Sequence, residues 1–121
     1  MRIVLTIGGE VLSATLNDSR STRDFVALLP LTLTFHDLLE REKYAGLPQA
    51  LSPDAPRAFS YEIGQIAYWS PGPDVAIFYR QDLRATPQPG IIVLGCVDGP
   101  VAALDVPGSM SITIELAERP A

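Results

Sequence analysis

The chain has 121 residues, enough to bury one hydrophobic core without disulfides or a structural metal, and we expect a single domain over residues 1–121. Its 47% hydrophobic and 19% charged residues exclude an intrinsically disordered chain. A net charge of −5 argues against binding to nucleic acid or to an anionic membrane surface, and no run of 18 apolar residues is present to span a bilayer.

The chain is expected to begin with a β-hairpin and a short helix. Residues 2–7 and 10–16 have strand-like patterns and flank a pair of glycines, which can adopt the positive φ angles of a tight hairpin turn. A helix is predicted over residues 22–29, because Ser21 or Thr22 can cap it and its apolar residues share one face. The proline that follows ends this helix.

The middle of the chain is less regular. Residues 31–35 alternate Leu and Thr as a strand does, and residues 36–58 form a long connection in which residues 37–44 could make two turns of helix. In such a helix His36 and Glu40 would share a face at a spacing that suits a divalent metal. A metal site needs three or more ligands, so we predict a solvated turn and no metal.

Most of the second half is predicted to be β-structure. Strands are expected over residues 63–69, 75–79, 91–97 and 111–116, with a short helical turn over 101–104. Many short strands without a βαβ rhythm favour a mainly β fold. We expect a closed barrel of about eight mostly antiparallel strands, capped by one or two short helices.

Four segments resemble those of small bacterial cyclophilin-like domains, in the same order along the chain: ATLNDSRSTRDFVALLPLTLTF, EREKYAGLPQAL, GQIAYWSPGPDVAIFY and LGCVDG. The resemblance covers about residues 3–116 and implies a cyclophilin-like β-barrel. Gln65 departs from the pattern, because many relatives have Asp there. The resemblance carries no established activity with it.

Prolyl isomerase activity is the activity that the resemblance suggests first, and the residues do not carry it. True cyclophilins present an arginine in an F-H-R run, whereas the nearest string here, Phe35-His36-Asp37, ends in an acid. A carboxylate cannot donate the charge-assisted hydrogen bond that lowers the amide rotation barrier. A weak, divergent isomerase is therefore an alternative that would need Arg57 or Arg80 in a concave apolar pocket, and we assign no catalytic residue.

Two aromatic pairs are the strongest candidates for a binding surface. Tyr68 and Trp69 are adjacent on one predicted strand, and Phe78 and Tyr79 on the next, so one member of each pair should fill the core and the other face outward. Exposed aromatic rings beside Arg80 would form a recognition patch. A second small core covered by the long connection explains the same residues equally well.

Glu42 and Tyr44 lie in the long connection and complete the candidate site with Trp69, Phe78 and Arg80. Either they anchor the connection or they form one lip of a groove. We therefore expect a non-catalytic module that binds a small molecule or a peptide without a cofactor. A structural or homo-oligomeric protein is the third alternative.

Cys96 is the single cysteine and cannot form an internal disulfide, which favours a reducing, cytoplasmic location. Its neighbours Val93, Leu94 and Val97 are apolar. We therefore expect a cysteine that is buried in the core.

Overall fold

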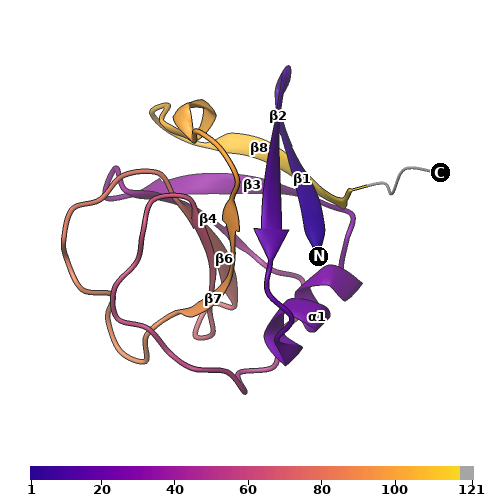
Figure 1. Ribbon diagram of the computed structural model, residues 1–121. Coiled ribbons are helices and arrows are strands. Elements are labelled where there is room, and N and C mark those ends of the chain that lie inside the picture. The colour runs from indigo at the N-terminus through magenta and orange to yellow at the C-terminus, as the bar shows by residue number, and fades with distance from the viewer. Residues whose placement is uncertain (118–121) are drawn as a thin grey trace.

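Eight strands close into an antiparallel β-barrel in the computed structural model, which describes residues 1–117 (Figure 1). The strands are β1 (Arg2–Ile7), β2 (Glu10–Leu16), β3 (Leu31–Leu38), β4 (Glu42–Gly46), β5 (Gln65–Trp69), β6 (Asp74–Phe78), β7 (Ile92–Val97) and β8 (Met110–Leu116). Around the barrel they follow the order β1-β2-β7-β5-β6-β4-β3-β8. The predicted mainly β closed barrel is confirmed. Residues 118–121 of the expected domain lie outside the described part.

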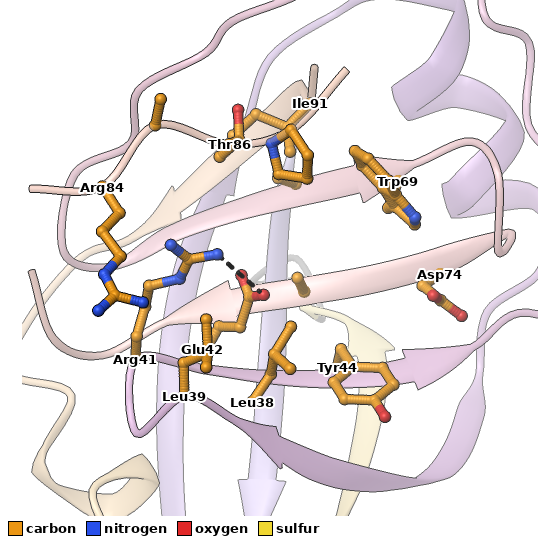
Figure 2. Close-up of a pocket in the computed structure, with 14 residues that line it drawn as sticks. Leu38, Leu39, Arg41, Glu42, Tyr44, Trp69, Asp74, Arg84, Thr86 and Ile91 are labelled. Atoms are coloured by element: carbon orange, nitrogen blue, oxygen red, sulfur yellow. Dashed lines mark ion pairs between the residues drawn. The ribbon is translucent and has the colours of Figure 1, made fainter. Parts of the chain in front are cut away.

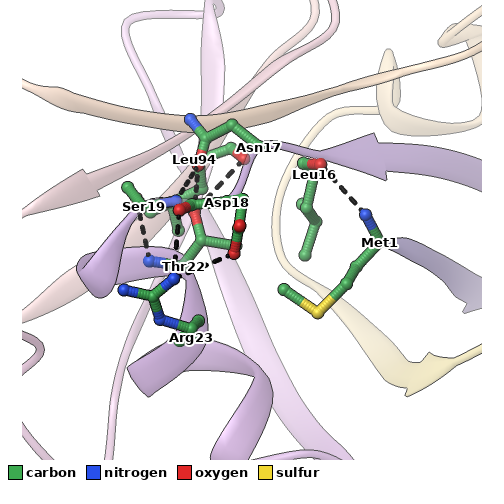
Figure 3. Close-up of polar contacts among 8 residues, drawn as sticks. All are labelled: Met1, Leu16, Asn17, Asp18, Ser19, Thr22, Arg23 and Leu94. Atoms are coloured by element: carbon green, nitrogen blue, oxygen red, sulfur yellow. Dashed lines mark hydrogen bonds and ion pairs between the residues drawn. The ribbon is translucent and has the colours of Figure 1, made fainter.

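The α-helix, α1 (Arg20–Ala27), begins two residues earlier than predicted. Ser19 is the N-cap, and its hydroxyl accepts a hydrogen bond from the Thr22 amide at 3.1 Å (Figure 3). The predicted caps have other partners: Ser21 donates to the Ser52 carbonyl, and Thr22 donates to the Asn17 side chain. No helix within residues 1–117 has the length and apolar character needed to cross a membrane.

The helix predicted over residues 37–44 is wrong, because a β-hairpin occupies this stretch. β3 continues to Leu38, a tight turn follows, and β4 then pairs with both β3 and β6. Pairing with two neighbours satisfies the β4 backbone, and this outweighs the local helical spacing. His36 therefore lies on a strand and Glu40 in the turn. Within the described residues, no three metal-binding side chains gather.

The barrel interior is mostly apolar and is closed at its ends by α1 and by the 3₁₀ helix η1 (Ala102–Leu104) (Figure 1). Phe25 of α1 and Leu104 of η1 are fully buried in this core. Tyr68 and Tyr79 also point inward, which confirms that one member of each aromatic pair fills the barrel.

A second, smaller apolar cluster covers part of the barrel's outer face. It consists of Tyr61, Ala67, Phe78 and Ile91, and it is held by the connections that follow β4 and β6. These connections are joined by an antiparallel bridge between Ala58 and Ile91. The cluster explains why β6 and β7 are almost continuously apolar.

Cys96 is exposed, so the expectation of a buried cysteine is wrong. The pairing of β7 with β5 shifts at a bulge opposite Ile66 and Ala67, so Leu94 and Val97 both lie in the core although they are three residues apart. Cys96, which pairs with Thr15 and Gln65, therefore lies on the outer face. The outer cluster of Tyr61, Ala67, Phe78 and Ile91 does not extend to this position. Apolar neighbours in sequence therefore did not indicate on which face the thiol lies.

Candidate functional site

A cavity of about 360 Å³ lies on the outer face of β4, β5 and β6 (Figure 2). Its floor includes Ala67 and Ala76, which are direct partners in the β5–β6 register. Two small side chains opposite one another leave a depression between larger neighbours. Tyr44, the partner of Ala76 on β4, and Trp69 on β5 line its sides.

The rim comes from the β3–β4 turn and from the connection between β6 and β7. Leu38 and Leu39 line the cavity from the turn, and both are exposed. Thr86 lines it from the connection, where its amide donates to the Phe59 carbonyl at 2.9 Å and its hydroxyl to the Ala58 carbonyl at 3.1 Å. These bonds hold the upper rim against the segment that covers the outer face.

A buried ion pair forms one wall of the cavity. Arg41 and Glu42 are 5% and 7% exposed, and Arg41 Nη2 lies 3.6 Å from Glu42 Oε1. The Arg41 guanidinium also lies over the Tyr61 ring, 5.1 Å from its centre, and 3.5 Å from Asp82 Oδ1. Burial raises the pKa of Glu42 above its ordinary value, and the charge of Arg41 offsets part of this effect.

A second carboxylate, Asp74, lines the cavity at the far end of β6 and pairs with Trp69 and Gly46 in the strand register. Its side chain accepts no hydrogen bond from the residues that the structure describes, and burial raises its pKa. A Cβ built on Gly72 would lie 2.3 Å from Asp74 Cγ, so glycine is needed there for the carboxylate to keep this position.

The structure brings three of the five residues predicted for the site, Glu42, Tyr44 and Trp69, to this cavity. Phe78 faces outward as expected, but it is fully buried beneath Tyr61, whose ring stacks on it at 4.1 Å. Arg80 is exposed and pairs with Asp105 at 2.7 Å, away from the lining.

The lining residues that sequence reasoning missed include Leu39, Arg41, Asp74 and Arg84. Asp74 could have been found, because it directly precedes the predicted strand over residues 75–79. The other three had no usable signal, because their placement depends on the hairpin and on the connection from β6 to β7.

The charged residues of the cavity are arranged for binding a ligand and do not form a metal site or an isomerase site. Glu42 on β4 is opposite Phe78, which is four residues from Asp74 on β6, so the two carboxylates are separated by about 13 Å along the strand. This separation is too large for both to ligate one metal ion. Arg57, one of the arginines that an isomerase would need, donates to Ser70 Oγ at 2.9 Å and does not line the cavity.

Comparisons with known proteins agree with the barrel. The solution structure of a hypothetical protein from Archaeoglobus fulgidus superposes with a TM-score of 0.78 at 22% sequence identity, over 97% of this chain and 95% of that one. This likeness shows the fold. No curated protein matches the chain. A sequence model of the Cyclophilin-like family matches residues 5–115, and the chain therefore belongs to that family.

Proposed function

We propose that this protein is a non-catalytic binding module that holds a small molecule or a short extended peptide in the outer-face cavity. The observation that carries the proposal is the cavity itself. Its volume of about 360 Å³ is within the range of small-molecule sites, and it combines an apolar floor with two aromatic side chains and a few charged groups. A cytoplasmic location is part of the proposal, because the exposed thiol of the single cysteine, Cys96, suits a reducing compartment. A bacterial source is expected from the resemblance to small bacterial cyclophilin-like domains.

Trp69 provides the test, because it is the only tryptophan and lines the cavity. It is half-buried, so acrylamide should quench its emission in the free protein. A panel of metabolites and short peptides should contain members that change this emission saturably and protect the indole from the quencher. An emission that no member of the panel changes would count against the cavity as a binding site.

Ala76→Leu is the matched variant, because it fills the floor without removing a charge or the reporter. Its side chain would point into the cavity, so stability should change by less than about 1 kcal/mol while binding falls at least tenfold. Calorimetric titration provides a second readout. Equal binding by both proteins would place the ligand elsewhere.

The same samples distinguish the two other functions. A weak isomerase would accelerate cis/trans exchange of a proline peptide, and Ala76→Leu would abolish that acceleration. A homo-oligomer would show a concentration-dependent sedimentation coefficient with Trp69 protected between chains. A binding module predicts neither result.

A further inference from the structure

The charged side chains around the cavity are ordered by sign along its length. Figure 2 shows Arg84 and Arg41 at one end, Glu42 beside Arg41 toward the middle, and Asp74 at the opposite end. The strand register supports this order, because Glu42 is opposite Phe78 while Asp74 begins the same strand, β6. The two arginines thus share one end of the cavity, where Glu42 is paired with Arg41, and Asp74 lies at the other end.

The arginine end has hydrogen-bonding capacity that the protein does not use. Arg41 is buried, yet its Nε has no hydrogen-bond partner among the described residues, and its contacts to Glu42 and Asp82 are long, at 3.6 and 3.5 Å. Arg84 is exposed and makes no ion pair within residues 1–117. Because Arg41 Nε is shielded from solvent, an anionic ligand group would bind chiefly to the exposed Arg84, and the neighbouring guanidinium of Arg41 would add its positive charge.

At the opposite end of the cavity, a carboxylate lacks a positively charged partner among residues 1–117. Asp74 is half-buried and accepts no hydrogen bond within the described residues. Tyr44 and Trp69 flank it in Figure 2. A cation beside a desolvated carboxylate and aromatic rings gains both Coulomb and cation–π attraction.

The distance between the two ends sets the length of the ligand. Glu42 marks the arginine end and is opposite Phe78, which is four residues, or about 13 Å, from Asp74 along β6. Between them the floor is formed by Ala67 and Ala76, which offer no charge. An extended tripeptide spans about 10 Å, so its two termini would reach the charged ends while its middle lies on the floor.

We infer that the cavity binds an elongated zwitterion of about tripeptide length, with its carboxylate at Arg41 and Arg84 and its ammonium group at Asp74. This inference rests on the proposed function, because it names the chemical class of the ligand for the same cavity. The ordered charges set the orientation of the ligand, and the apolar floor accepts a small aliphatic middle residue.

The test compares the free tripeptide Ala-Leu-Ala with its N-acetylated, C-amidated and doubly blocked forms, by Trp69 emission and by calorimetry. Each block should weaken binding about tenfold or more, because it removes one charge-assisted contact. In Asp74→Asn, the free and the N-acetylated peptides should bind with equal affinity. In Arg84→Gln, the difference in affinity between the free and the C-amidated peptides should be much smaller than in the parent. Asp54→Asn and Arg20→Gln, at exposed positions outside the lining, are the charge-matched controls and should bind as the parent does.

Equal affinity for all four peptides would overturn the inference that the ligand is a zwitterion, while the cavity would still be a binding site. Tighter binding of the doubly blocked form would do the same. A loss on N-acetylation that persists in Asp74→Asn would overturn the assigned orientation. Failure of all four peptides would overturn this inference, and the proposed function would still be decided separately by the wider panel and by Ala76→Leu.

Discussion

Lys43 is the chain's only lysine, and its side chain is fully buried in the barrel. Its ammonium group donates to the carbonyls of Val106 and Gly108, at 2.6 and 2.7 Å, and lies 3.2 Å from Asp37 Oδ1. Tyr79 donates to the same carboxylate. Every proton of the ammonium group therefore has a partner, which is the condition under which a buried charge is tolerated.

We predict that Lys43→Met lowers the free energy of unfolding by about 3–5 kcal/mol, because Asp37 would keep its charge without the ammonium group. Urea unfolding at pH 7 measures the loss. The double variant Lys43→Met/Asp37→Leu should recover part of it, since no unpaired charge remains. A cost below about 1 kcal/mol for the single variant would mean that the pair contributes little.

Asp37 also gives the cluster a pH dependence. Burial alone would raise its pKa, but hydrogen bonds from Tyr79, from Lys43 and from the Glu40 amide together lower the pKa below the ordinary value of 3.8. A carboxyl whose pKa is lowered by folding stabilises the protein above its unfolded value and loses this contribution as the pH falls further. Acid unfolding below about pH 4 should therefore be less steep in the double variant, which lacks the carboxyl.

At the scale of elements, the β3–β4 hairpin positions much of the cavity wall and contains backbone strain. Leu39 and Glu40 have φ angles of 57° and 53°, and the Arg41 amide closes the turn by donating to the Leu38 carbonyl at 3.1 Å. Two residues with positive φ define a type I′ turn, which ordinarily uses Asn and Gly. Here a leucine and a glutamate occupy these positions, and Leu39 lines the cavity.

We expect Glu40→Gly to stabilise the protein by about 0.5–1 kcal/mol. Glycine removes the left-handed strain, and this gain exceeds the greater entropy of the unfolded chain. The backbone amide remains free to donate to Asp37 as before. Thermal or urea unfolding measures the change. Glu62→Gly, at an exposed position where φ is not positive, should give no gain, and an equal gain there would remove the explanation.

The β3–β4 turn is also a feature that the sequence did not predict. The hairpin at residues 2–16 was predictable because two glycines mark its turn. The second hairpin has no such marker, and the spacing of its residues imitates a helix. The cap of α1 posed a similar problem, since Ser19, Ser21 and Thr22 can each cap a helix. The Ser21 hydroxyl donates to the Ser52 carbonyl and the Thr22 hydroxyl to the Asn17 side chain, which leaves Ser19 as the cap.

For the whole molecule, the closed barrel could be predicted from the number and pattern of strands, whereas the cavity could not. Its floor exists because Ala67 and Ala76 become partners, and its outer walls come from β4 and from the connection after β6. Those neighbours are set by the strand order, which brings β6 between β5 and β4. Alternation along a strand predicted that one aromatic residue of each pair faces outward. The neighbours of that residue on the adjacent strands depend on the strand register, which the sequence did not reveal.

Closure of the barrel depends on its first and last strands. β1 pairs with β8 through partners such as Ile3 and Leu116, and the Ala117 amide donates to the Arg2 carbonyl at 3.0 Å. β8 also pairs with β3 and buries Ile112 and Ile114. Deleting residues 110–121 would therefore leave β1 and β3 each with one unpaired edge and would open the core.

We predict that this truncated chain does not fold, whereas a circular permutant does. The permutant begins at Gly9, ends at Gly8 and joins residue 121 to residue 1 through a short Gly/Ser linker. It keeps all eight strands, and the space around both glycines is open. It should be less stable by about 1–3 kcal/mol, because β1 and β2 are no longer joined by a two-residue turn.

Circular dichroism and urea unfolding compare the chains, and calorimetry checks that the permutant binds ligand as the parent does. Cooperative unfolding of the truncated chain would show that the β8 pairings are not needed for the barrel to form, and the closed barrel could then not be the source of its stability.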